Sequence, residues 1–177
     1  MLTLSKKVCL LGDFAVGKTS LVRRFVYDLF DDRYLSTIGV KVSRKTITVP
    51  REYDMVELTM MLWDLAGSEE FNHMRSSYLR GAAGVFLVGD LTRPATFEAL
   101  PRYVADIKEM GARVPLLLAA NKADLLGQAN DSGALLQDVQ SLAESLGAPL
   151  YVTSAFTGDR VEDAFRHLGR MTADYDS

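Results

Sequence analysis

Short apolar runs alternate with segments of helical period along the chain, a pattern typical of a largely parallel sheet covered by helices. Strands are expected at residues 7–11, 40–49, 56–62, 84–90, 114–121 and 150–154. Helices are expected at 19–30, 95–110, 132–146 and 161–171, with a short irregular one near 71–79. Only the turn at 50–54 separates the second and third strands, which predicts an antiparallel pair at one sheet edge. The predicted fold class is therefore α/β, with three α/β/α layers, a six-stranded mainly parallel sheet with one antiparallel edge strand, and about five helices.

Composition narrows the class of protein. The 177 residues are 48% hydrophobic and 24% charged, which fits one globular domain over residues 1–177, with a short tail at 170–177. A net charge of −3 argues against a protein held to nucleic acid by its overall field. No apolar run approaches the roughly 20 residues of a spanning helix, and no signal peptide is recognisable. The single cysteine fits a reducing compartment, and with no signal peptide we expect a cytoplasmic protein. We also expect it to be a monomer.

The most specific motif is GDFAVGKT at residues 12–19, which matches G-x-x-x-x-G-K-[ST] between a predicted strand and a predicted helix. A glycine-containing loop at this place can turn its backbone N–H groups toward phosphate oxygens, at the positive end of the helix dipole. Lys18 would then reach the β- and γ-phosphates, and the Thr19 hydroxyl could ligate magnesium. The expected nucleotide contacts here are Phe14, Ala15, Val16, Gly17, Lys18, Thr19 and Ser20. The motif alone leaves nucleoside kinases and ATPases open.

Two further segments indicate which base and which metal ion the protein binds. Asn121, Lys122 and Asp124 follow a buried strand, where ligands gather in open α/β sheets. The Asp124 carboxylate can accept two hydrogen bonds from guanine N1–H and its amino group, a pattern that adenine does not offer. Asp64 could reach magnesium through water, and the Gly67 N–H could contact a γ-phosphate.

With these motifs the chain resembles the small GTPases of the Ras superfamily, and most closely the Rab family, from Lys6 to about Met171. Four more stretches carry the resemblance: TIGV at 37–40, WDLAGSEEF at 63–71, YLRGA at 78–82 and LVGDLT at 87–92. The first two look like the family's switch I and switch II segments.

The resemblance implies roles for several residues. Phe30 would lie against the guanine edge, Tyr34 would close over the phosphates, and Thr37 would join Thr19 on magnesium when a γ-phosphate is present. Ser154 and Ala155 would form the last guanine motif, with the Ala155 N–H donating to guanine O6. Plainer interpretations also exist: Phe30 as a core residue ending its helix, Tyr34 and Thr37 as solvated loop residues, and Ser154 as a strand end.

The sequence departs from the family pattern at three site positions. Ser68 stands where a glutamine usually orients the attacking water, so we expect slow hydrolysis. Phe14 replaces a small residue near the path of an arginine supplied by an activating protein; it either obstructs that arginine or folds against its own loop. Phe156 replaces a lysine of the last guanine motif, yet guanine preference should persist through Asp124.

The resemblance also implies an effector surface, made of Val40, Val42, Trp63, Phe71 and Tyr78. Trp63 and Tyr78 match two members of the Rab aromatic patch, whose third member is Val42 here. A partly exposed patch is the preferred interpretation, with core packing of Trp63 as its competitor.

The sequence therefore predicts a switch that binds GTP or GDP with Mg²⁺ and hydrolyses GTP slowly, with Lys18, Thr37, Gly67 and Ser68 as the catalytic set. Effector, exchange and activating proteins are the expected partners, and nucleic acid is not. The C-terminal residues carry no prenylatable cysteine or polybasic run. Either the protein works as a soluble switch, with any membrane association through partners, or a longer tail is missing. The alternatives are a GTP-binding scaffold with negligible hydrolysis and, from a different class, a P-loop phosphotransferase.

Overall fold

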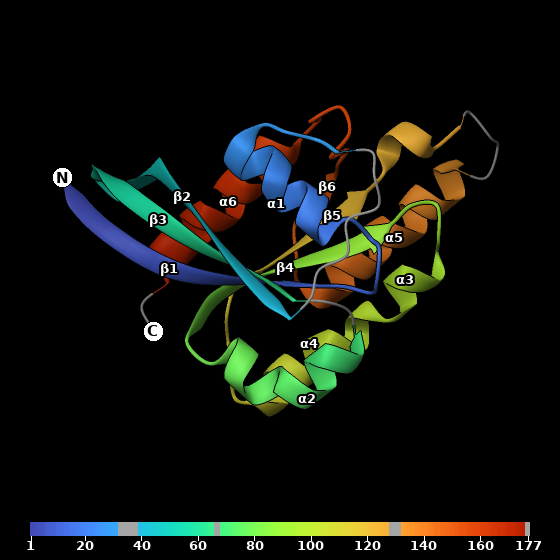
Figure 1. Ribbon diagram of the computed structural model, residues 1–177, viewed down its shortest axis with the longest axis horizontal. Helices are drawn as coiled ribbons and strands as arrows, with labels where there is room; N and C mark the ends of the chain where they lie inside the picture. Colours follow the sequence, from blue (N-terminus) through green and yellow to red (C-terminus); the bar gives the residue numbers. More distant parts are fainter. Residues whose placement is uncertain (32–38, 66–67, 128–131, 176–177) are drawn as a thin grey trace.

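The computed structural model describes residues 1–31, 39–65, 68–127 and 132–175, which form one mixed sheet with helices on both faces (Figure 1). The strands are β1 (Leu2–Leu11), β2 (Val40–Arg51), β3 (Asp54–Leu65), β4 (Ala82–Asp90), β5 (Leu116–Asn121) and β6 (Leu150–Val152). The helices are α1 (Lys18–Tyr27), α2 (Ser68–Leu79), α3 (Ala95–Glu98), α4 (Leu100–Glu109), α5 (Ser132–Leu146) and α6 (Val161–Asp174), with a 3-10 turn at Ala123–Leu125.

The sheet has the strand order β2-β3-β1-β4-β5-β6, and only the β2–β3 pair is antiparallel. The predicted hairpin at one edge is thus confirmed, as are all six predicted strands. Strand β1 starts at Leu2, earlier than the apolar run suggests, because residues 2–6 pair in parallel with β3 while leaving some side chains exposed. All parallel strands end at the same edge of the sheet, which is where a ligand site is expected.

Two apolar cores hold the helices against the sheet. On one face, α1 and α6 pack through a stack in which Phe165 lies between Phe25 and Phe86, at centroid distances of 4.4 and 4.3 Å. On the opposite face, α4 and α5 pack against β4 and β5 through residues such as Tyr103 and Ala143. Figure 1 shows α1 and α6 above the sheet, with α2 and α4 below it.

The described residues form six α-helices, one more than the sequence predicts. The segment expected as a single helix at 95–110 divides at Ala99 into α3 and α4. Pro101 causes the division, because it has no N–H to donate to the Phe97 carbonyl and its ring would clash with that carbonyl in a continuous helix. The segment predicted to be short and irregular near 71–79 is instead a helix of 12 residues, α2.

Candidate functional site

The candidate site lies at the carboxyl ends of the parallel strands. The loop at 12–17 leaves β1 and enters α1, Asp64 lies near the end of β3, and Asn121 ends β5. Ser154 follows β6 closely. The sequence-predicted phosphate loop and guanine motif, more than a hundred residues apart, thus meet at one edge of the sheet.

The two outer glycines of the phosphate loop are required by close contacts. A Cβ added at Gly12 would lie 2.4 Å from the Val88 carbonyl oxygen. A Cβ at Gly17 would lie 2.3 Å from Asn121 Nδ2, and the Gly17 φ of 104° is a conformation that side chains disfavour. The loop therefore passes against β4 and β5 at a distance that only glycine allows.

Lys18 lies inside the loop that it follows. Its side chain is buried, and Nζ donates to the carbonyl oxygens of Gly12 at 2.7 Å and Asp13 at 3.1 Å. Burial lowers the pKa of Lys18 to about 8, although the carboxylates of Asp64 and Asp13 act in the opposite direction. The ammonium group therefore remains largely charged at pH 7, in the place where the motif predicts phosphates.

A pair of oxygen donors lies beside this lysine. The Thr19 hydroxyl donates to the carboxylate of Asp64, which is buried at 2% exposure. Hydroxyl and carboxylate oxygens are ligands that Mg²⁺ accepts, and Mg²⁺ commonly takes few protein ligands together with substrate phosphates. Across the described ranges there is no group of three or more His, Cys, Asp or Glu side chains that could hold a metal. The Thr19 hydroxyl and the Asp64 carboxylate are oxygen donors that fit a magnesium ion shared with a bound phosphate.

The remaining residues of the loop differ in their surroundings. Val16 is fully buried in the core, so any contact that it makes with a nucleotide has to come from its backbone. Ala15 adopts a positive φ of 61°, and Ser20 is half-buried on α1. Phe14 is 57% exposed, which excludes the interpretation that its ring is buried against its own loop.

Asn121 joins the two halves of the site. It is 1% exposed, its Nδ2 donates to the Val16 carbonyl at 3.1 Å, and its Oδ1 accepts from the Thr153 hydroxyl at 3.1 Å and the Ala155 N–H at 3.3 Å. One side chain therefore fixes the phosphate loop against the loop after β6.

Asp124 and Ser154 are hydrogen bonded to each other beside the predicted base site. The Ser154 hydroxyl donates to Asp124 Oδ1 at 2.7 Å and accepts from the Thr157 N–H at 3.1 Å. The Asp124 residue is exposed, while Ser154 and Ala155 are buried. An exposed carboxylate oriented by a buried hydroxyl suits the recognition of a pair of donors on a ligand.

Two aromatic side chains lie next to this end of the site. Phe30 and Phe156 meet edge to face, with ring centroids 5.3 Å apart, and are 37% and 56% exposed. Phe30 is not the last residue of its helix, because α1 ends at Tyr27, so the core interpretation of Phe30 is wrong. Arg24 holds the loop carrying Phe156 by donating to the carbonyls of Ala155 at 2.9 Å and Phe156 at 2.6 Å.

Sequence reasoning assigned no role to Asp90 and Arg93. Asp90 ends β4 directly beside Asn121 in the sheet register and is buried. Its Oδ2 lies 2.8 Å from Lys122 Nζ and 3.1 Å from Arg93 Nε. Burial acts to raise the pKa of Asp90, but hydrogen bonds from Lys122, Thr92 and Arg93 together hold it below its ordinary value. The sequence does carry one signal that could have identified Asp90, namely a charged residue at the carboxyl end of an apolar strand.

The effector surface needs one correction. Tyr78 is 1% exposed, and its hydroxyl donates to the backbone carbonyls of Leu10 and Trp63, so the expectation that it is partly exposed is wrong. Trp63 is half-buried beneath Lys7, whose Nζ lies 3.7 Å from the ring centroid. Val42 pairs with Trp63 across β2 and β3 and is 43% exposed, while Val40 is half-buried.

Some predicted site residues lie outside the described part of the chain. These are Tyr34, Thr37 and Gly67, together with the side chains of Ser68 and Phe71.

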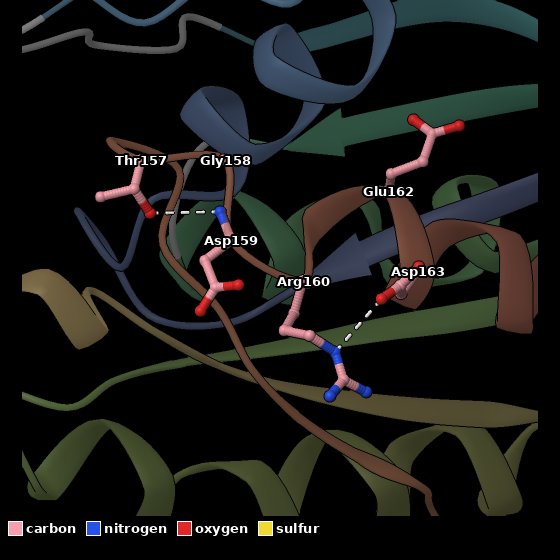
Figure 2. A pocket seen from close by; sticks show the side chains of 6 residues that line it. All are labelled: Thr157, Gly158, Asp159, Arg160, Glu162 and Asp163. Atoms are coloured by element: carbon pink, nitrogen blue, oxygen red, sulfur yellow. Dashed lines mark hydrogen bonds and ion pairs between the residues drawn. The ribbon is translucent and has the colours of Figure 1, made fainter.

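A cavity of about 420 Å³ opens where α6 begins, just after the loop that carries Ser154 (Figure 2). Asp159, Arg160, Glu162 and Asp163 are among the residues that line it. Arg160 Nε lies 3.3 Å from Asp163 Oδ2. With three carboxylates and one guanidinium, this cavity is unsuited to a phosphate group, so it is not an extension of the predicted phosphate site. No described helix is both long and apolar enough to cross a membrane.

Comparison with known proteins gives one family. The sequence model of the Ras family matches residues 7–174. Rab-31 of Rattus norvegicus is 37% identical over 166 residues, which is 93% of this chain and 82% of that protein. Rab-13 of Mesocricetus auratus and Rab-1D of Dictyostelium discoideum are each 36% identical over 165 residues, covering 93% of this chain and 78% of each of them. The chain is therefore a Rab-like small GTPase of the Ras family.

Proposed function

We propose that this protein binds GTP and GDP together with Mg²⁺, hydrolyses GTP slowly, and binds effector proteins according to the nucleotide. The observation that carries the proposal is the meeting of two motifs: the loop enclosing Lys18 and the pair of Asn121 and Asp124 lie at one sheet edge, joined by the Asn121 hydrogen bonds. One motif suits phosphates and the other suits guanine, at the two ends of one site.

Base recognition would rest on Asp124. Its carboxylate can accept from both N1–H and the 2-amino group of guanine, whereas adenine presents an unprotonated N1 and no 2-amino group. The Ala155 N–H, which donates to Asn121 Oδ1 in this structure, would donate to the guanine O6 in the complex with nucleotide. Phe30 and Phe156 would cover the base from the solvent side.

Phosphate binding would use Lys18 and the loop N–H groups. Thr19 would ligate the magnesium ion directly and Asp64 would reach it through water, with Thr37 as a further ligand in the GTP state. Bound there, Mg²⁺ would neutralise charge on the β- and γ-phosphates. The segments containing Thr37 and Gly67 would be ordered by the γ-phosphate and released after hydrolysis, which is how such switches change their partners.

Hydrolysis should be slow because Ser68 is too short to orient the attacking water as a glutamine would. We expect a rate no faster than the roughly 10⁻⁴ per second of unassisted small GTPases. The exposed Phe14 would also obstruct an arginine supplied by an activating protein. These two residues favour, as the second candidate function, a GTP-bound scaffold with negligible hydrolysis.

Two measurements test the proposal. Mass analysis of nucleotide released from the denatured, freshly purified protein should find GTP or GDP, and an adenine nucleotide in their place would contradict it. Single-turnover hydrolysis of GTP should then be slow and should become faster in Ser68→Gln. A fast wild type that Ser68→Gln leaves unchanged would refute the role given to Ser68. Detectable hydrolysis separates the switch from the scaffold, and phosphate transfer to water alone excludes a phosphotransferase.

A further inference from the structure

Three consecutive carbonyl groups of the phosphate loop are held by side chains from outside the loop. The Phe14 carbonyl accepts from Arg93 Nη2 at 2.7 Å, and the Ala15 carbonyl accepts from Lys122 Nζ at 2.9 Å. The Val16 carbonyl accepts from Asn121 Nδ2 at 3.1 Å. The three donors lie at or just beyond the ends of the neighbouring strands β4 and β5, so they hold the loop from one side.

The orientation of these carbonyls fixes the orientation of the N–H groups that follow them. In a planar trans peptide the C=O of one residue and the N–H of the next point in opposite directions, and the described residues contain no cis peptide. The N–H groups of Ala15, Val16 and Gly17 therefore each point away from the donor that holds the preceding carbonyl. A row of N–H groups on one side of a loop is the arrangement that binds phosphate oxygens.

Arg93 and Lys122 are themselves oriented by one carboxylate. Both cations bond to Asp90 Oδ2, whose side chain is 1% exposed, while Thr92 donates to Asp90 Oδ1 through its N–H at 2.8 Å and its hydroxyl at 2.7 Å. A buried carboxylate held by these donors has little freedom, so it sets the direction in which each cation reaches the loop. Arg93 can do this because its guanidinium binds the carboxylate through Nε while Nη2 remains for the Phe14 carbonyl.

We propose that Arg93 is a positioning residue of the phosphate loop: by holding the Phe14 carbonyl, it aims the Ala15 N–H at a phosphate of the bound nucleotide. This inference rests on the proposed function, because it assigns a task within the same nucleotide site. It predicts that losing Arg93 weakens binding of the phosphates and leaves recognition of the base unchanged.

The test compares GDP with inosine diphosphate, which carries the same phosphates but lacks the 2-amino group of guanine. In Arg93→Ala we expect the affinity for both nucleotides to fall by the same factor, roughly fivefold to tenfold for one charge-assisted hydrogen bond at a partly exposed site. The ratio of the two affinities should stay within twofold of the wild-type ratio. Arg93→Gln, which retains a donor without the charge, should lose less.

Arg166→Ala is the matched control. Arg166 is exposed to a similar extent, 45% against 44% for Arg93, and it also bonds to a carboxylate on its own segment, Glu162, and to a carbonyl of a distant strand, that of Thr48. Its removal should leave both affinities unchanged. In the GDP complexes, amide hydrogen exchange should become faster at Ala15 in Arg93→Ala and remain slow there in the control.

The outcomes separate the two proposals. If wild-type protein does not prefer GDP to inosine diphosphate, the proposed function fails. If it does, and Arg93→Ala binds GDP within twofold of wild type, the positioning role is wrong. A changed ratio of the two affinities, or unchanged exchange at Ala15, also overturns it. Melting temperatures with GDP bound show whether the variants are folded, and Arg93→Gln supplies the answer if the alanine variant is not.

Discussion

Replacing Asn121 with alanine tests how strongly one buried amide joins the phosphate loop to the base loop. The substitution removes three hydrogen bonds, and it leaves the Val16 carbonyl, the Thr153 hydroxyl and the Ala155 N–H without their partner. Val16 and Thr153 are fully buried and Ala155 is 4% exposed, so bulk water does not replace the amide without rearrangement.

The expected loss follows from these three groups. Leaving a buried polar group unsatisfied costs about 1–3 kcal/mol, so three independent losses would total about 3–9 kcal/mol. Losses in one network are not additive, and the Thr153 hydroxyl can rotate to another acceptor, so we expect about 3–4 kcal/mol. For a domain of this size each kcal/mol lowers the melting temperature by about 2–4 °C, which gives a decrease of roughly 6–16 °C.

Urea unfolding of the nucleotide-free protein, followed by circular dichroism, measures this loss directly. The matched control is Asn72→Ala, because Asn72 is an exposed residue of α2 and its removal should cost little. The reasoning is refuted if Asn121→Ala loses less than about 1 kcal/mol, the lower end for a single unsatisfied group, or no more than the control.

Three further predictions concern other parts of the site and fold. Phe156→Ala should speed GDP dissociation by roughly two- to tenfold, because an edge-to-face contact with Phe30 contributes about 0.5–1.5 kcal/mol. Release of a fluorescent GDP analogue measures this rate. An unchanged rate argues against the proposal that Phe30 and Phe156 cover the base. Asp90→Asn should lower the free energy of unfolding, measured in urea, by about 2 kcal/mol, because Arg93 and Lys122 lose their buried carboxylate partner. A loss below 0.5 kcal/mol, about that of an ordinary surface substitution, contradicts the structural role of Asp90. Burial lowers the pKa of His167, which bonds to the Tyr151 hydroxyl at 2.8 Å, so the unfolded chain takes up this proton first and stability falls as the pH drops below 6.5. His167→Gln should flatten that decrease in melting temperature, and equal slopes in both proteins would contradict the assignment.

The sequence predicted the parts of the site that depend on spacing along the chain. The loop from Gly12 to Thr19 and the segment from Asn121 to Asp124 each follow an apolar strand, and parallel strands bring such ends to one edge. Their meeting was therefore foreseeable, whereas the individual hydrogen bonds of Asn121 were not.

Contacts between distant segments were outside the reach of pattern reasoning. Arg93 and Phe14 are 79 residues apart, and no periodicity relates them. Tyr78 was expected in a partly exposed patch. Its hydroxyl instead donates to the backbone carbonyls of Leu10 and Trp63 beneath α2, which makes burial of the ring favourable. The division at Ala99 was missed because the apolar spacing continues through Pro101, while the missing N–H of proline interrupts the backbone hydrogen bonds.

The central claim is that Asp124 and the phosphate loop form one site selective for guanine nucleotides. Calorimetric titration of the nucleotide-free protein with GDP and with ADP, each with Mg²⁺, tests it most directly. Two hydrogen bonds to a charged carboxylate contribute about 1.5–3 kcal/mol each, so GDP should bind roughly 10²- to 10⁴-fold more tightly than ADP. Asp124→Ala should lose most of that preference while still binding GDP through its phosphates. Equal affinities of the wild-type protein for GDP and ADP would contradict the account.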